Sequence, residues 1–142
     1  MRTMLSHICA LLLTAGLASA ADASVMTDSR QLDLTAQHLA TTAEREAKAG
    51  TLSNDQARLL EDLAARARTF HFDLEANQYS VIQEQLSWDQ VADAFLTARN
   101  AVGDQGSKNL RAEVFRVHSL MNRIDQGMGG SGFWHGRHGW TG

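Results

Sequence analysis

The chain has 142 residues, a formal net charge of −3, one cysteine and no proline. This length allows one domain with a substantial core. The mildly acidic balance gives little support for nucleic-acid binding, which needs a dense basic surface. The absence of proline leaves helices free of its ring clash.

Residues 1–20 have the parts of a secretory signal peptide. Arg2 supplies the positive start, residues 8–18 are a short apolar stretch, and Ala18-Ser19-Ala20 is the small-x-small pattern that precedes cleavage. The apolar stretch is shorter than the roughly 18–20 residues of a membrane span. Cys9 lies at the front of that stretch, whereas a lipoprotein cysteine follows it. We expect cleavage after Ala20, export to the periplasm or the medium, and no integral membrane span afterwards.

Cleavage would change the composition. Removing 20 of the 142 residues leaves 122, with 12 basic and 16 acidic residues and therefore a net charge of −4. The lone cysteine would be lost. The mature chain would then have no disulfide, thiolate nucleophile or sulfur ligand for a metal.

The next part of the chain predicts two helices after a short N-terminal extension at 21–28. Gly50 occupies the position of a left-handed residue that ends a helix. The sequence Ser53-Asn54-Asp55-Gln56 has the S-x-x-Q form of a capping box, which predicts a new helix there. The short connection makes the two helices antiparallel. The predicted inward residues, spaced by three or four, are Leu32, Ala36, Leu39, Ala43 and Ala47, then Leu60, Leu63, Ala67, Phe70 and Leu74.

The second half of the chain predicts two more helices. Residues 77–86, with Tyr79, Ile82 and Leu86, are either a short helix across the end of a bundle or an irregular connector. Ser87-Trp88-Asp89-Gln90 is a second candidate capping box, residues 103–106 a loop, and residues 107–126 the last helix. The predicted inward residues are Trp88, Val91, Phe95, Ala98 and Val102, then Leu110, Val114, Val117, Met121 and Ile124.

Together these segments predict an all-α, up-down-up-down (antiparallel) four-helix bundle over residues 29–126, followed by a glycine-rich tail at 127–142. The apolar seams follow a 3.5-residue repeat, which favours crossing angles of about 20°. The same seams suit an elongated coiled-coil dimer, which is the alternative architecture.

The tail contains two patterns that resemble catalytic or cofactor motifs. Gly127, Gly129 and Gly132 spell G-x-G-x-x-G, but they follow a helix, whereas a dinucleotide site follows a strand. Ser131 has a glycine before it, but Phe133 replaces the second glycine of a nucleophile elbow. Neither pattern predicts a site.

The histidines and aromatic residues of the tail are better candidates. His135 and His138 are predicted ligands for copper, nickel or zinc, although two imidazoles alone make a weak site. Phe133, Trp134 and Trp140 are predicted to bind a partner, because aromatic residues often dominate interfaces. A tail packed on the bundle and a disordered tail are the alternatives.

Two histidines flank the seams of the bundle, His71 on the second helix and His118 on the fourth. With Met121 they suggest an interhelical metal or haem site. The expected axial mismatch of about 6 Å, at roughly 1.5 Å per residue, argues against such a site. So does the lack of E-x-x-H and C-x-x-C-H motifs. We expect no cofactor there, and we expect these histidines and His38 to point to water.

The charged residues favour solvated surfaces over catalysis. The acidic pairs Glu44/Glu46 and Glu61/Asp62 neighbour basic residues on polar faces, whereas catalytic carboxylates need burial or a charged partner. The arginines of the last helix are expected to form surface pairs. They are Arg111, Arg116 and Arg123.

The sequence as a whole predicts an exported, non-enzymatic helical bundle that acts by binding. Its role would be that of an envelope scaffold, a stress protein or a protein-interaction module, with an unknown protein partner or a second copy of itself, and without nucleic acid. The alternative is an envelope metal-binding protein that uses His135 and His138. A third class, an enzyme whose site forms only in an oligomer, stays open.

Overall fold

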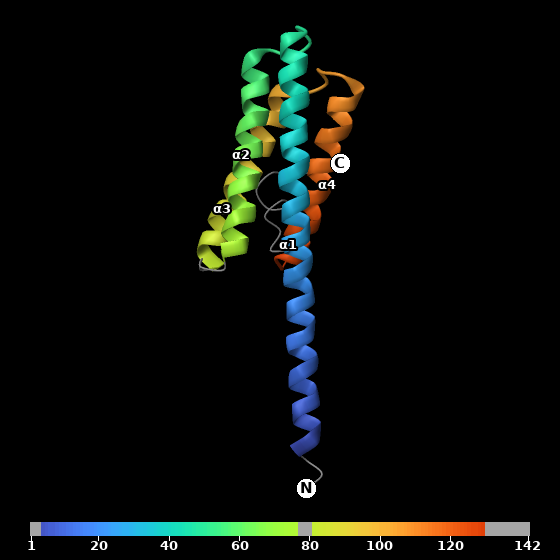
Figure 1. Cartoon of the computed structure of the whole chain (residues 1–142), viewed down its shortest axis with the longest axis vertical. Coiled ribbons are helices and arrows are strands. Elements are labelled where there is room, and N and C mark those ends of the chain that lie inside the picture. The colour runs from blue at the N-terminus through green and yellow to red at the C-terminus, as the bar shows by residue number, and fades with distance from the viewer. Residues whose placement is uncertain (1–3, 77–80, 130–142) are drawn as a thin grey trace.

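The structure is a computed structural model, which describes residues 4–76 and 81–129 and the side chains of residues 23–76 and 82–129. Within these ranges it is all-helical, with four helices and no strand. The helices are α1 (Met4–Lys48), α2 (Asn54–Ala76), α3 (Val81–Val102) and α4 (Lys108–Gly127). They alternate in direction along the long axis (Figure 1). The predicted helical fold class is confirmed for these residues, and the arrangement is consistent with a four-helix bundle.

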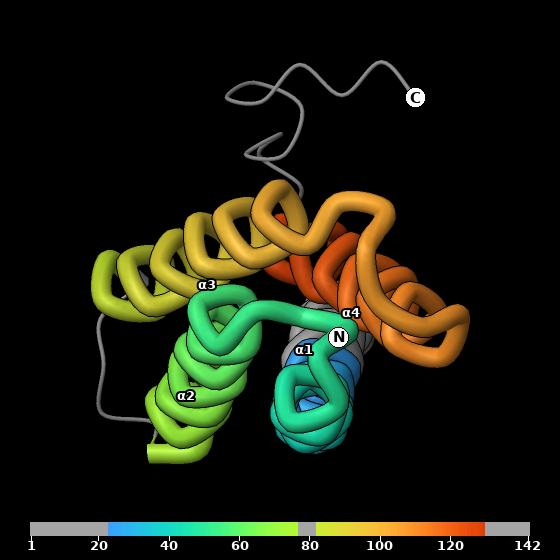
Figure 2. Tube along the Cα trace, turned by 90° about the horizontal axis from the view of Figure 1, so that it is seen from above, coloured from blue at the N-terminus to red at the C-terminus, as the bar shows by residue number. Residues whose placement is uncertain are grey.

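The helices pack in the order α3, α2, α1, α4. α1 packs against both α2 and α4, and α2 packs against α3. Among the described residues, α3 and α4 do not pack closely against each other, although they are neighbours in the chain. Viewed along the axis of α1, α3 lies beside α2 and α4 beside α1 (Figure 2). The α1–α2 pair is therefore the centre of the fold.

The predicted inward faces form the core. All of the predicted inward residues are buried except Ala47, Leu74 and Val114, which are partly buried and pack against the core. The largest buried side chain, Trp88, contacts Phe70 with ring centroids 5.1 Å apart. Helical periodicity therefore identified the core correctly, since it fixes which side chains share a face.

The connection between α1 and α2 has the predicted local motifs. Gly50 has a φ of +79° and its N–H donates to the carbonyl of Ala47, while the N–H of Thr51 donates to the carbonyl of Glu46. These two bonds form a Schellman motif. The N–H of Ser53 donates to Gln56 Oε1 at 2.8 Å, and the N–H of Gln56 donates to Ser53 Oγ at 3.1 Å. The capping box is thus confirmed in both directions.

The N-cap of α4 is Ser107, and a residue of another helix supplies the second hydrogen bond of its cap. Ser107 Oγ accepts from the N–H of Leu110 at 3.1 Å, and the N–H of Ser107 donates to Glu46 Oε2 at 2.9 Å. Leu110 occupies the position where a capping box has Glu or Gln, so α4 cannot make the second bond itself. Glu46 on α1 makes it instead. The expectation that Glu46 is only a solvated surface residue is therefore wrong, and its carboxylate holds the loop between α3 and α4.

α1 extends beyond its predicted start at Ser29. It begins at Met4, so residues 21–28 are helical instead of an extension, and its N-terminal part projects past the other helices (Figure 1). Val25 is 7% exposed and lies so close to Gly127 that a Cβ there would be 2.5 Å from Val25 Cγ2. Contact with α4 therefore extends the packed part of α1 back to Val25. None of the helices in the described part of the chain is long and apolar enough to cross a membrane.

The predicted capping box at Ser87 is wrong. Ser87 lies inside α3, which begins at Val81, and its hydroxyl donates to Asp73 Oδ2 on α2. No glycine or proline interrupts the helix before Ser87, and Asp73 supplies a partner that keeps the hydroxyl away from the backbone. Ile82 and Leu86 therefore lie on α3 itself, where both are exposed. Tyr79 lies outside the described residues.

Replacing Gly106 with alanine is expected to destabilise the fold more than the matched change at Gly50. Both glycines have positive φ, +85° and +79°, so each alanine should cost about 1–2 kcal/mol. A Cβ at Gly106 would also lie 2.5 Å from Leu110 Cδ2 and 3.2 Å from Glu46 Oε2, whereas one at Gly50 meets nothing within 4 Å. Overpacking should add about 1–3 kcal/mol to the Gly106→Ala loss. Urea unfolding measures both values, and equal losses would contradict the close packing of Gly106.

Candidate functional site

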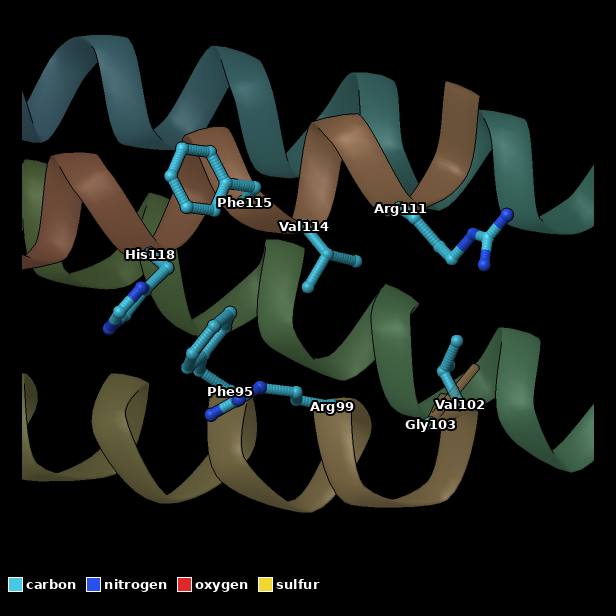
Figure 3. Close-up of a pocket in the computed structure, with 8 residues that line it drawn as sticks. All are labelled: Phe95, Arg99, Val102, Gly103, Arg111, Val114, Phe115 and His118. Atoms are coloured by element: carbon cyan, nitrogen blue, oxygen red, sulfur yellow. The ribbon is translucent and has the colours of Figure 1, made fainter. Parts of the chain in front are cut away.

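A cleft of about 200 Å³ lies between α3 and α4. The backbones of these two helices, each packed on the central pair, stay apart there, and the rings of Phe95 and His118 meet between them. Figure 3 shows side chains of both helices facing each other across it. The residues that line the cleft are Phe95, Arg99, Val102 and Gly103 on one side, and Arg111, Val114, Phe115 and His118 on the other.

The cleft residues occupy one face of each helix. On α4 they fall at positions i, i+3, i+4 and i+7, and on α3 at i, i+4 and i+7, which are spacings that place side chains in a row. Phe95 and Val102 belong to the buried core, while Phe115 is 69% exposed. The cleft therefore runs from the core outward to solvent.

His118 of α4 stacks against Phe95 of α3 across the cleft. The two rings are parallel to within 3°, with centroids 5.9 Å apart. Burial, and then the charge of Arg99, lower the pKa of His118 below its usual 6.5. The imidazole is therefore neutral at pH 7. The expectation that His118 points to water is wrong, because the side chain is half-buried in this stack.

The cleft is cationic although the chain is acidic. Arg99 and Arg111 lie on opposite walls, and none of the eight described lining residues is a carboxylate. In Figure 3 Arg111 lies toward Val102 and Gly103, while Arg99 extends toward Phe95 and His118. A concave site with charge of one sign attracts ligands of the other sign. Sequence analysis named Arg111 and His118 but missed Arg99 and Phe115. The spacing of residues 111, 115 and 118, which places them on one face of α4, was the available signal for Phe115.

Comparison of the chain with protein-family models, with curated proteins and with solved structures finds no match. The geometry of the cleft and of the other polar groups is therefore the basis for a function.

A second polar group joins α1 to α2. Ser29 Oγ donates to the carbonyl of Met26 at 2.8 Å and lies 3.0 Å from His71 Nδ1, while His71 Nε2 lies 3.3 Å from Glu75 Oε1. These are the residue types of a nucleophilic triad, but Ser29 is 0% exposed, so a substrate cannot reach its hydroxyl. The expectation that His71 points to water is also wrong, because it is buried in this contact between helices.

The remaining acidic candidates are on the surface, as predicted. Glu44 is exposed and lies 2.7 Å from Lys48 Nζ, and this hydrogen bond and charge lower the pKa of the Glu44 carboxyl. Glu61 and Asp62 are also exposed, and Asp62 Oδ1 lies 3.4 Å from Arg66 Nε. They are surface charges on the helices.

Two other charged residues pair between helices instead of along one helix. His38 is exposed, as expected, but its Nδ1 lies 2.9 Å from Glu113 Oε1 on α4. Arg123 Nη2 donates to Asp28 Oδ1 on α1 at 2.7 Å. Both pairs fix α4 against α1.

The candidate residues of the tail lie outside the described residues. They are Phe133, Trp134, His135, His138 and Trp140. Their predicted roles in partner binding and in binding copper, nickel or zinc therefore stay predictions. Within the described part of the chain, no cluster of three or more His, Cys, Asp or Glu side chains is arranged to hold a metal ion.

Replacing His118 with glutamine is expected to reduce the loss of stability on acidification. Since folding lowers the pKa of His118, the unfolded chain binds more protons there as the pH falls below about 6.5. The free energy of unfolding should therefore fall as the pH drops below about 6.5. At higher pH the contribution of His118 to this free energy does not change with pH. Urea unfolding at about pH 7.5 and about pH 5 should show a smaller loss for His118→Gln than for the wild type. Equal losses would contradict the half-buried state of the imidazole.

Proposed function

We propose that this protein is an exported, non-enzymatic helical bundle that acts by binding, and that the cleft between α3 and α4 is its binding site. The observation that carries the proposal is the combination of apolar and cationic side chains in one cleft. Small-molecule sites are typically concave and mostly apolar, with a few placed polar groups.

The position of Phe115 supports binding at this cleft. Single exposed apolar residues are common on protein surfaces, and Leu34 on α1 is one, at 53% exposed. Phe115 is more exposed, at 69%, and it lines the cleft together with Phe95 and Val114. An exposed aromatic ring beside an apolar cavity is a feature of interaction sites.

The loop that joins the two walls of the cleft is held in place. Glu46 on α1 accepts from the N–H of Ser107, and Gln56 Nε2 on α2 donates to the carbonyl of Ala101 at 2.8 Å and to Gln105 Oε1 at 2.9 Å. The central pair of helices thus fixes the connection between α3 and α4 from both sides. A site fixed in advance loses less entropy when a ligand binds.

Export rests on the signal-like residues 1–20. The N-terminal part of α1 projects past the other helices (Figure 1). The packed bundle is therefore compatible with processing. In the periplasm or the medium, the protein would serve as a scaffold, stress or interaction protein. The alternative, metal binding through His135 and His138, has support from the sequence alone.

Photocrosslinking tests the cleft as a binding site. With benzoylphenylalanine in place of Phe115, illumination of producing cells is expected to give covalent adducts of the full chain, detected by mass spectrometry. The same residue in place of Leu34 is the matched control, since Leu34 is also exposed and apolar but lies on α1. Adduct levels at position 115 no higher than at position 34 would contradict the proposal.

Processing after Ala20 is a separate prediction. The protein recovered from the envelope or the medium is expected to begin at Ala21, as read by mass spectrometry. Ala20→Tyr should leave residues 1–20 attached, because the cleavage site needs small side chains. Ala23→Tyr, at an exposed position outside the small-x-small pattern, should be processed normally. A wild-type chain that stays unprocessed in the cytoplasm would contradict export.

A further inference from the structure

We infer that the ligand of the α3/α4 cleft is a small organic anion, with one carboxylate on a flat or short apolar body. This inference rests on the proposed function, that the cleft is a binding site, and adds the chemistry of the ligand. Three features of the cleft carry it: its charge, its apolar lining and its size.

The charge of the cleft selects an anion. Arg111 is exposed on the α4 wall, and the ion pairs among the described residues do not include it. A guanidinium binds a carboxylate with two parallel hydrogen bonds, which are stronger than bonds between neutral groups. Arg99 adds positive potential from the α3 wall. This contribution does not require Arg99 to give up the interactions that it makes with neighbouring residues. None of the eight described lining residues is a carboxylate that would oppose an anion.

The lining also requires an apolar body on the ligand. Phe95, which is 1% exposed, closes the base of the cleft with His118, and the half-buried Val114 and the exposed Phe115 supply the accessible apolar surface along α4. Inorganic phosphate or sulfate would leave this surface in contact with water and gain nothing from it. Flat rings pack well on such aromatic faces. The ligand therefore combines an anionic group with an aromatic ring or a short acyl chain.

The size of the cleft limits the ligand. Its volume of about 200 Å³ is below the roughly 300–1,000 Å³ of pockets for drug-sized molecules. A nucleotide or a phospholipid could place only part of itself in this open cleft. An amphipathic peptide helix needs a groove for anchors over two or more turns. A single-ring, fused-ring or short-chain carboxylate is the class that fits.

Calorimetry with a matched pair of probes tests this inference. Naphthoate and naphthamide share their shape and differ in charge, and both are titrated into the full-length protein. Naphthoate is expected to bind about tenfold or more tightly than the amide, as expected for charge-assisted hydrogen bonds. Arg111→Gln should remove most of that preference, with the remainder due to Arg99, and Phe115→Ala should weaken the binding of both probes. Arg116→Gln is the matched control, because Arg116 is also exposed on α4 but does not line the cleft.

The other outcomes overturn the inference in distinguishable ways. Equal binding of the two probes rejects the anion and leaves the cleft as an apolar site. A preference for naphthoate that Arg111→Gln leaves undiminished places the anion elsewhere than beside Arg111 and also overturns the inference. No binding of either probe, with adducts still formed at position 115, rejects the ligand class while the proposed function stands. A variant of the full chain with alanine at Phe133, Trp134 and Trp140 tests whether the tail occupies the cleft. If this variant binds both probes equally while the wild type binds neither, the tail is the occupant and the inference fails.

Discussion

The close packing of α1 against α2 is the contact on which the rest of the structure depends. Both helices bury small side chains in the core, Ala36 and Ala43 on α1 and Ala57 and Ala67 on α2, and small side chains permit a close approach of helices. α3 then packs on α2, with Trp88 and Phe95 in its core face, and α4 packs on α1. This order leaves α3 and α4 in contact through side chains such as Phe95 and His118, without close packing of their backbones. The cleft is therefore a direct consequence of the packing order.

Polar contacts between helices then fix the position of each outer helix. Asp28 and His38 of α1 pair with Arg123 and Glu113 of α4, and Asp73 of α2 accepts from Ser87 of α3. A helical wheel would place most of these residues on a polar, solvated face. Long polar side chains at the edge of an apolar seam can, however, reach the next helix. They fix the spacing of α3 and α4, and hence the width of the cleft, without closing it.

The sequence alone predicted the structure correctly wherever the interacting groups are close together in the chain. The core faces, the turn at Gly50 and the capping box at Ser53 depend on partners a few residues away, and all were predicted correctly. The motif at Ser87 failed because a cap forms only where the preceding residues leave the helix, and here they do not. Phe115 and Arg99 were missed because their shared environment depends on which helices pack, which local patterns do not encode.

The buried polar group and the open cleft lie in different parts of the described fold. Within the described residues, the groups most suited to catalysis, Ser29 and His71, are buried between α1 and α2, where they join the helices. The accessible cleft contains groups suited to recognition instead. Its His118 imidazole is neutral at pH 7 because burial lowers its pKa, and it stacks on Phe95. An arginine on each wall adds positive charge beside these rings, so apolar and cationic groups share one cleft.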